Sequence, residues 1–488
     1  MNSFLKSAFL LSLAALLSTA CIKENLVPRS VEPGEDARVE EIHFKWNKVR
    51  TIVSSSISIP VKLILMDDGT EYTDPALLEW SVSNDKMATI TQEGKLTTKT
   101  TTGELTVTAQ ADGVSATIPV YITSGVSTTG IDKTAFTLFD KGCGVEDNYG
   151  AFNIVPQGFD ITRDGKVYYL RVSNAENCKF RMFLNRVQPN ASTFHSGTEA
   201  CIECHFFGHG TNFSIEEDGD DKYVWIATWG NKVTSEDPQK NKQYWNEQII
   251  GRFKFQDGSS VQPKDVPDYF YIGQRRDIHV AIDTEGDDLM VYYTDGDPVT
   301  PRHFVIYSLS EAMKAPLRNK TLSSLTYGGD GSDVEEVTDS PTLKVHDLTK
   351  ITKKAEFGFQ GQAQAQAYVE GGGDPSDPEA LSYYNYQGFE IHDGAIYFYE
   401  GEGQYKTSDK SHAYITVFNY AGQVIEKRTK VNIAEDWNAL ESNGITSNGY
   451  MEGEGLKVRN GFLYVCLGSN PDGYSRGNIF KFNVAKLK

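Results

Sequence analysis

Short runs in which apolar and polar residues alternate fill most of the chain after residue 40. Examples are VKLILM and GELTVTAQA early on, and VYYLRV, LMVYYT and IYFYE further along. Alternation with period two is typical of strands that have one face in a core. Asp-Gly and Asn-Gly pairs between many of these runs are typical of hairpin turns. The sequence therefore predicts an all-β protein.

Residues 40–125 contain the first set of strands: VKLILM, EWSVS, MATI, GELTVTAQA and SATIPVYIT. No helical stretch interrupts them, so we predict a β-sandwich of about seven strands. Trp80 is followed by a polar turn, the strand from Met87, a turn at Gly94, and Gly103 before the next strand. This order resembles the bacterial immunoglobulin-like group 2 domain. The resemblance implies a spacer or an adhesive module, and we expect a spacer.

Five segments of residues 130–488 share one shape: a polar or glycine-rich lead-in, a short strand, an acidic or glycine turn and an aromatic strand. The anchor residues lie 54, 65, 111 and 67 residues apart: Phe159, Phe213, Ile278, Phe389 and Leu456. Spacings near 60 residues with about four strands each are typical of propeller blades. The long interval holds an insertion or a sixth blade. Because the Gly-, Gln-, Ala- and Pro-rich run at 361–380 has the composition of a long loop, we predict a five-bladed β-propeller. An unrelated set of hairpins in a sandwich is the alternative.

Three parts of this region resemble a known family. They are the segment from Arg276 to Leu309, the Gln-Gly-Phe-Glu run at 387–390, and the closing EGEGLKV, FLYV and NIFKFN strands. They are similar to helveticin J-type bacteriocins, to the propeller of teichoic-acid biosynthesis protein C and to certain phage receptor-binding proteins. The resemblance covers roughly residues 135–488 and depends on strand patterns. It implies a propeller that engages cell-envelope polymers or, as in helveticin J, kills related bacteria.

The first 21 residues have the parts of a lipoprotein signal. Lys6 precedes the apolar core AFLLSLAALL, and three small residues lead into Cys21. A transmembrane helix needs about 20 apolar residues, so this core is too short to span a bilayer. We therefore predict a signal peptide at 1–20 and lipidation of Cys21, which would anchor the chain in a membrane. The leucine usual three residues before the cysteine is Leu17, one residue early, and an ordinary secretory signal is the alternative.

Residues 21–39 are polar and contain two prolines, which predicts a flexible tether. Lys23 and Glu24 resemble the signals that send lipoproteins to the outer face of Gram-negative cells. We therefore expect a surface-exposed protein on the bacterial outer membrane. The net charge of −19 repels phosphate polymers, so nucleic acid is not an expected partner. Neutral glycans, other envelope polymers and cations are compatible with it.

In a propeller, the loops that lead into the innermost strands converge at one mouth of the central axis. Polar residues at these positions predict a binding face for a sugar or a cation: Gln157, His209, Asn212, Arg275, Arg276, Asp277, Gln387, Glu390, Glu452, Glu454 and Tyr405. Aromatic residues nearby in sequence are candidates for stacking on sugar rings: Trp229, Tyr386, Tyr399 and Tyr405. The alternative is that the polar ring caps the channel and binds water.

Two EGEG runs place carboxylates in pairs, Glu400 with Glu402 and Glu452 with Glu454. Carboxylates about 5–9.5 Å apart serve as acid and base in glycoside hydrolysis. If the chain is a glycosidase or lyase, these four residues and Glu390 are its candidate catalytic groups. A Ca²⁺ site and solvated turns are the alternatives. The sequence has no HExxH motif and no phosphate-binding glycine motif, so we expect a binding protein, with a glycosidase or an antibacterial effector as alternatives.

The segment from Cys201 to His205, CIECH, matches the haem c attachment pattern. Cys201, Cys204, His205 and His209 are also candidate zinc ligands. The motif occurs once and its histidine follows at once, so a local disulfide or free thiols are favoured and no cofactor is expected. Cys143 and Cys178 are candidates for a pair, and Cys466 is predicted to be a small buried residue in a strand.

Overall fold

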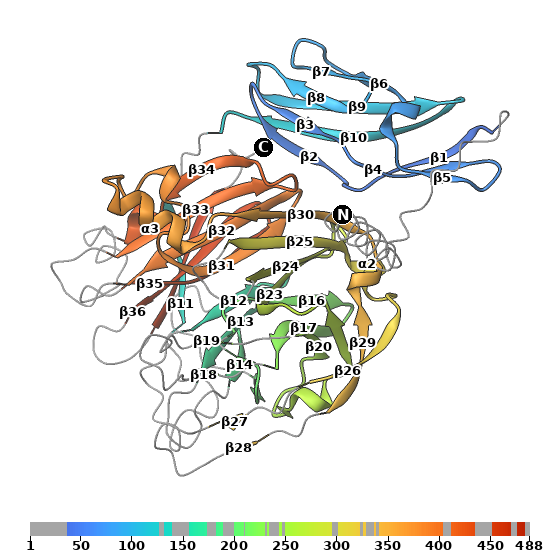
Figure 1. Cartoon of the computed structure of the whole chain (residues 1–488). Helices are drawn as coiled ribbons and strands as arrows, with labels where there is room; N and C mark the ends of the chain where they lie inside the picture. The colour runs from blue at the N-terminus through green and yellow to red at the C-terminus, as the bar shows by residue number, and fades with distance from the viewer. Residues whose placement is uncertain are drawn as a thin grey trace, which may run out of the picture.

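The computed structural model describes residues 37–125, 131–138, 156–172, 182–188, 200–208, 210–229, 232–233, 244–245, 249–294, 301–322, 326–327, 336–337, 341–403, 411–434, 451–469 and 476–483. Strands arranged in several sheets dominate these residues (Figure 1), which confirms the predicted all-β class. No helix among them is long and apolar enough to cross a membrane. The predicted signal peptide, Cys21 and nearly all of the predicted tether lie outside the described residues.

The strands between residues 39 and 123 form three small sheets. In spatial order these are β1 (Val39–Phe44), β4 (Val61–Met66) and β5 (Glu71–Tyr72); β2 (Val49–Ile52), β10 (Val114–Thr123), β9 (Gly103–Ala111) and β6 (Glu79–Val82); and β3 (Ser56–Ser58), β8 (Lys95–Thr98) and β7 (Ala88–Ile90). Along β9, Leu105, Val107 and Ala109 are buried in alternation with more exposed residues. The predicted alternation with period two therefore determines which side chains of this strand lie in the core.

The tryptophan and the glycine turn that the sequence singled out pack against each other. A Cβ atom on Gly94 would lie 2.9 Å from the ring of Trp80, so only glycine fits beneath the indole. The indole Nε1 donates to the carbonyl of Pro75 at 2.9 Å, and Phe44 packs beside the ring with the centroids 6.0 Å apart.

Five larger sheets follow along the chain (Figure 1). The first contains β12 (Gly158–Ile161), β13 (Val167–Val172), β14 (Met182–Val187), β15 (Ala200–Cys204) and β21 (Ser260–Val261); the second contains β16 (Phe213–Asp218), β17 (Asp221–Thr228), β20 (Ile249–Lys254), β22 (Asp268–Tyr271), β29 (Thr342–Asp347) and β26 (Leu317–Thr321). The third contains β23 (Arg276–Asp283), β24 (Asp288–Thr294), β25 (Arg302–Ser308) and β30 (Lys353–Phe359); the fourth contains β31 (Asn385–His392), β32 (Ala395–Glu402), β33 (His412–Asn419) and β34 (Val424–Lys430). The fifth contains β35 (Glu452–Arg459), β36 (Phe462–Ser469), β37 (Arg476–Asn483) and β11 (Ile131–Leu138).

Two features connect these sheets. The fifth sheet joins both ends of the region, because β11 pairs antiparallel with β37. The first strands of the five sheets also contact one another in order: β12 contacts β16, β16 contacts β23, β23 contacts β31, β31 contacts β35, and β35 contacts β12. Residues on these five strands are therefore brought together from positions as far apart as 158 and 459.

The 111-residue interval adds strands to two of the five larger sheets and contains the short pair of β27 and β28. In the described residues, β26 and β29 extend the sheet of β16. The run at 361–380, expected to be a long loop, contains helix α3 (Gln362–Glu370) and the 3-10 turn η5 (Pro378–Ala380). The loop prediction was wrong here because Ala and Gln are good helix formers. At the start of the helix, the side chain of Gln364 accepts a hydrogen bond from the backbone N of Gly361 at 3.1 Å.

Minor elements complete the described chain. They are the short pairs β18 (Lys232–Val233) with β19 (Tyr244–Trp245) and β27 (Thr326–Tyr327) with β28 (Glu336–Val337), helix α2 (Leu309–Ala312), and the 3-10 turns η1 (Pro75–Leu77), η3 (Pro263–Asp265), η4 (Leu348–Lys350) and η6 (Asn432–Ala434).

The N-terminal sheets pack directly on the larger ones, where β2 contacts β33 and β34 (Figure 1). Trp46 is buried at this junction, and its Nε1 donates to the carbonyl of Lys354 at 2.9 Å. Lys48 and Arg50 both form ion pairs with Asp393, the residue that follows β31. One hydrophobic cluster contains buried residues of both parts. The strands at 39–123 are therefore held against the rest of the chain.

Candidate axial binding site

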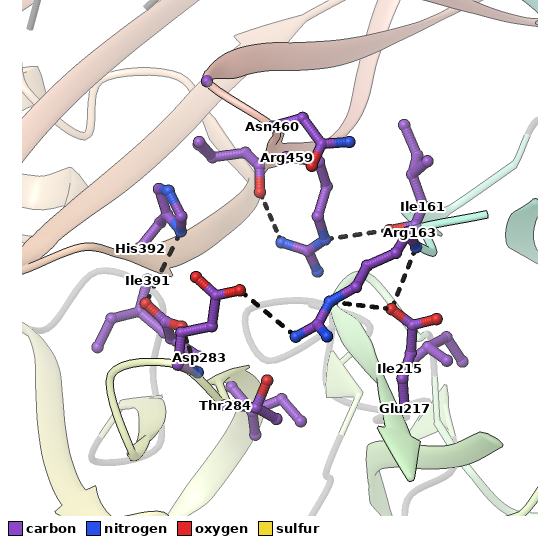
Figure 2. A pocket seen from close by; sticks show the side chains of 14 residues that line it. Ile161, Arg163, Ile215, Glu217, Asp283, Thr284, Ile391, His392, Arg459 and Asn460 are labelled. Atoms are coloured by element: carbon purple, nitrogen blue, oxygen red, sulfur yellow. Dashed lines mark hydrogen bonds and ion pairs between the residues drawn. The ribbon is translucent and has the colours of Figure 1, made fainter. Parts of the chain in front are cut away.

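The first strands of the five sheets end around one pocket of about 270 Å³, which we call the axial pocket (Figure 2). Each strand contributes one aliphatic residue to the lining, and we call these five residues the aliphatic ring: Ile161, Ile215, Ile282, Ile391 and Val458. Four of these residues lie two positions after a predicted anchor.

Ile282 corrects the predicted register of the third repeat. Ile282 lines the axial pocket as Ile391 does, so Val280, two residues before Ile282, is the equivalent of Phe389. The predicted anchor Ile278 therefore lies two residues too early. The pairing of β23 with β24 is irregular between Arg276 and His279. A bulge of this kind shifts the strand relative to its sequence pattern.

The rim of the axial pocket is polar. It consists of residues at the ends of the five strands and in the turns that follow them: Arg163, Glu217, Asp283, Thr284, Glu285, His392, Arg459 and Asn460. The side chain of Arg163 is 66% exposed, and its guanidinium lies 3.7 Å from Glu217 and 3.4 Å from Glu285. Figure 2 shows Glu217 beside Arg163, joined by dashed lines to both the backbone N and the guanidinium of Arg163. Arg163 thus connects the turn after β12 to the end of β16 and to the turn after β23.

Asp283 links the turn after β23 to the turn after β31. Its Oδ1 accepts hydrogen bonds from the backbone N of Glu285 and of Gly286, each at 3.1 Å. Its Oδ2 accepts a hydrogen bond from the backbone N of Asp393 at 3.0 Å and lies 3.7 Å from His392 Nδ1. Because backbone N–H groups satisfy this buried carboxylate, it stabilises the rim rather than offering a free charge to a ligand.

Four charged residues form what we call the axial ion network: Asp160, Glu390 and Lys457 beneath the aliphatic ring, and Arg459, which also lines the pocket. Lys457 Nζ lies 2.8 Å from Glu390 Oε2, and both side chains are buried. Arg459 lies 2.6 Å from Asp160 Oδ1 and 3.6 Å from Glu390 Oε1. Burial alone would lower the pKa of Arg459, but Asp160 and Glu390 raise it overall. Two cations and two anions therefore balance, as buried charges require.

On the far side of this network, three glycines let the first strands approach each other closely. A Cβ atom on Gly388 would lie 3.1 Å from the Cα of Gly455, and one on Gly455 would lie 3.3 Å from the Cα of Gly158. A Cβ on Gly158 would meet the carbonyl of Thr211 at 3.1 Å. The repeated Gln-Gly and Glu-Gly pairs of the sequence are thus explained by backbone packing.

The polar residues of the predicted binding face lie near these glycines, and most of them interact with other groups of the protein. The side chain of Asn212 is buried, donates to the carbonyl of Val280 at 2.8 Å and accepts from the backbone N of Phe389 at 3.3 Å. Gln387 is buried, and its Nε2 donates to the carbonyl of Gly401 at 3.2 Å. Asn212 thus connects the third and fourth sheets, and Gln387 bonds within the fourth, so these side chains do not form an open face.

The other predicted face residues have varied positions. Gln157 is half-buried, Arg275 lies 4.7 Å above the ring of Tyr293, and Asp277 has a left-handed backbone with φ 53° and approaches His279 at 3.2 Å. Arg276 begins β23. The side chain of Arg276 and all of His209 and Tyr405 lie outside the described residues.

The candidate catalytic carboxylates do not form an open pair. Glu390 is paired with Lys457. Glu400 is buried and paired with Arg428, while Glu402 is exposed; burial raises the pKa of Glu400 and Arg428 opposes this effect. Glu454 is also buried: its burial, reinforced by the half-buried Glu452, raises its pKa well above the usual value.

The aromatic candidates are also occupied by protein contacts. Trp229 and Tyr399 are buried and cannot stack on a ligand. Tyr386 stacks on Tyr292 with a centroid distance of 4.7 Å.

The two cysteines of the CIECH segment, which was a haem or zinc candidate, differ in state. Cys201 is disulfide-bonded, whereas Cys204 and Cys466 are free and buried. A disulfide excludes both the paired thioether links of haem c and a zinc site that uses both thiolates of CIECH. Within the described residues, no three His, Cys, Asp or Glu side chains form a metal-binding group. Cys143 and Cys178 lie outside the described residues, and Cys466 is the predicted buried residue in a strand.

No protein-family model and no curated protein sequence matches this chain. Among solved structures, the tail fiber of Staphylococcus aureus phage P68 is similar with 12% identity and a TM-score of 0.41, over 72% of this chain and 52% of that chain. The mannose phosphorylase MPT-4 from Leishmania mexicana has 10% identity and a TM-score of 0.33, over 72% and 88%. The α-L-arabinofuranosidase from Lactobacillus brevis has 8% identity and a TM-score of 0.31, over 69% and 93%. The chain spans about half the length of the tail fiber, and these weak similarities assign no site residue or activity to it.

Proposed function

We propose that this chain is a surface lipoprotein of the bacterial outer membrane whose propeller binds a glycan through the axial pocket. In this proposal the chain has a signal peptide at 1–20, a tether at 21–39, an immunoglobulin-like group 2 domain at 40–125 and a helveticin J-like propeller at 130–488. The five larger sheets are its blades. The ordered contacts among their first strands, and the pairing of β11 with β37, support a ring of five blades.

The observation that carries the proposed activity is the chemistry of the axial pocket. Its aliphatic residues suit the apolar face of a sugar ring, and its rim supplies hydrogen-bond donors and acceptors for the hydroxyl groups of the sugar. Thr284 and Asn460 are uncharged, and the cation Arg163 faces the anions Glu217 and Glu285. A volume of about 270 Å³ lies just below the range of about 300–1,000 Å³ that is usual for ligand pockets. The pocket therefore suits one small hydroxylated unit.

Charge and redox state support the remaining parts of the proposal. A net charge of −19 disfavours polyanions as ligands and leaves neutral glycans as the preferred class. The disulfide at Cys201 is typical of an oxidising compartment outside the cytoplasm and agrees with an exported protein. A binding role is favoured over hydrolysis because Glu390 and Glu400 are consumed by buried ion pairs. A lipid anchor favours capture over killing by a diffusing toxin.

A glycan array probed with the purified protein tests the proposal. We expect binding to neutral oligosaccharides that is lost in Thr284→Trp, because Thr284 is exposed on the rim and an indole there would fill the pocket. Thr117→Trp, at an exposed position of β10, is the control and should bind like the wild type. Absence of glycan binding would refute the function, and full binding by Thr284→Trp would refute the site. Release of reducing sugar from the bound oligosaccharides would favour a glycosidase instead.

A further inference from the structure

A second cavity, which we call the side groove, lies next to the axial pocket. It has a volume of about 300 Å³. Both cavities are lined by Asp283, Glu285 and His392, so the two are neighbours that share one wall. The other wall of the side groove includes Asn47 and Lys48 from the N-terminal part of the chain. A ligand held in the axial pocket therefore has a route outward along that part.

The axial pocket is closed at its inner end. Lys457 and Glu390 of the axial ion network are both buried beneath the aliphatic ring, and the glycine contacts between Gly388, Gly455 and Gly158 lie beyond them. A polymer therefore cannot pass through along the axis. The pocket suits the end of a chain, or a single side branch, and the following units must leave through the side groove.

Both walls of the side groove are fixed by protein contacts. Asn47 Nδ2 donates to the carbonyl of Gly286 at 2.6 Å, and Lys48 forms an ion pair with Asp393. Lys354 Nζ lies 2.7 Å from Asp288 Oδ1 and donates to the carbonyl of Gly286 at 3.1 Å. A groove whose walls are held before binding loses little entropy when a ligand enters.

The charges around the side groove are largely compensated from within. Lys48 is paired with Asp393, Asp288 is paired with Lys354, and Asp283 is satisfied by backbone N–H groups. A polyanion or a polycation would have to compete with these pairs. A neutral hydroxylated chain does not, because its hydroxyl groups can donate to the carboxylates and accept from the ammonium group.

From these observations we infer that the protein recognises the free end of a linear neutral glycan, and that Asn47 and Lys48 of the N-terminal domain contact its second and third units. The inference rests on the proposed glycan binding and adds to it. The N-terminal domain is then a part of the binding site and not only a spacer. Affinity must rise with chain length until the side groove is filled, and a blocked chain end must abolish binding.

The test uses neutral linear gluco-, manno- and xylo-oligosaccharides of one to six units, coupled to an array through their reducing ends. A second set carries a bulky pivaloyl group on the non-reducing end. We expect the wild type to bind trimers at least tenfold more tightly than monomers and to ignore the blocked set. Asn47→Trp should reduce the gain with length to less than twofold but keep monomer binding, whereas Thr284→Trp should lose both.

Gln110→Trp, at an exposed position of β9 in the same domain, is the matched control and should keep the full gain. Melting curves show whether Asn47→Trp is folded; if it is not, Asn47→Ala replaces it, with an expected threefold loss for trimers only. Full length dependence in the folded Asn47 variant, or equal binding of blocked chains, overturns the inference while leaving glycan binding intact. If the wild type binds none of the oligosaccharides, the proposed function itself fails, and the inference fails with it.

Discussion

Replacing Lys457 by Met is expected to destabilise the fold strongly, because the change breaks the axial ion network. The ammonium group lies 2.8 Å from Glu390 Oε2 and donates to the carbonyl of Phe213 at 2.7 Å. Both members of the ion pair are buried, with side-chain exposures of 1% and 0%. Removing one partner of a buried pair leaves an uncompensated charge and typically costs about 3–5 kcal/mol. We expect a loss near the middle of this range.

An exposed ion pair of the same geometry provides the control. Lys254 Nζ lies 2.7 Å from Asp221 Oδ1, but the two side chains are 55% and 42% exposed. Exposed pairs contribute about 0–1 kcal/mol, so Lys254→Met should change stability little. The two variants remove the same chemical group at nearly the same distance from its carboxylate, so the contrast reports the effect of burial together with the loss of the bond from Lys457 to the carbonyl of Phe213.

Equilibrium unfolding in urea at neutral pH measures both losses. The double variant Lys457→Met with Glu390→Gln removes both charges, and we expect it to recover part of the loss, because a neutral amide costs less to bury than an unpaired carboxylate. If Lys457→Met lowered the free energy of unfolding by less than about 1 kcal/mol, like the exposed control, the axial ion network would not be a fixed structure that closes the pocket.

Three further predictions concern single positions. Burial raises the pKa of Asp288 from 3.8 to about 6, so the ionisation of Asp288 destabilises the native state as pH rises from 4 to 6. Asp288→Asn removes this ionisation, so its free energy of unfolding relative to wild type should rise by up to about 3 kcal/mol over that range. Unfolding measured as a function of pH tests this. Gly455→Ala should cost more than Gly461→Ala in urea unfolding, because both have positive φ but only Gly455 has a neighbour, Gly158, within reach of a Cβ; equal losses would contradict this. Asp393→Asn keeps a good hairpin residue but removes the anion beside Lys48 and Arg50, so hydrogen exchange at residues 45–50 should quicken; unchanged exchange would show that these ion pairs do not hold the N-terminal strands.

The sequence predicted the elements of the fold well because local rules determine them. Both residues of the Asp393-Gly394 and Asn460-Gly461 turns have positive φ, as two-residue hairpins require. The register of β23 could not be predicted, because the irregularity beside Asp277 interrupts the alternation. Helix α3 was missed because the composition of its segment was taken to indicate a loop, although Ala and Gln favour a helix.

The candidate site was harder to predict because burial depends on which strands meet. The sequence marks Gln387 and Asn212 as polar, but it does not show that Asn212 bonds to backbone groups of two other strands and that Gln387 bonds to a carbonyl of the neighbouring strand. The rim residues Arg163 and Glu285 lie in turns and Glu217 lies near the end of β16, and the sequence pattern had marked these positions only as turns. A usable signal was present: charged residues follow the aliphatic position in most of the five repeats.

The contact between Asp393 and the N-terminal strands links the fold to the candidate site. Asp393 forms the turn after β31, pairs with Lys48 and Arg50, and donates its backbone N–H to Asp283 on the rim of the axial pocket. One residue therefore connects the placement of the N-terminal domain to the shape of the pocket. Burial raises the pKa of Asp393, but Lys48 and Arg50 lower it by more, so the pKa lies below its usual value. Its stabilising charge is therefore present at neutral pH and is lost only in strong acid. Separation of the N-terminal domain would remove Asn47 from the side groove, so a site of this composition depends on both parts of the chain staying together.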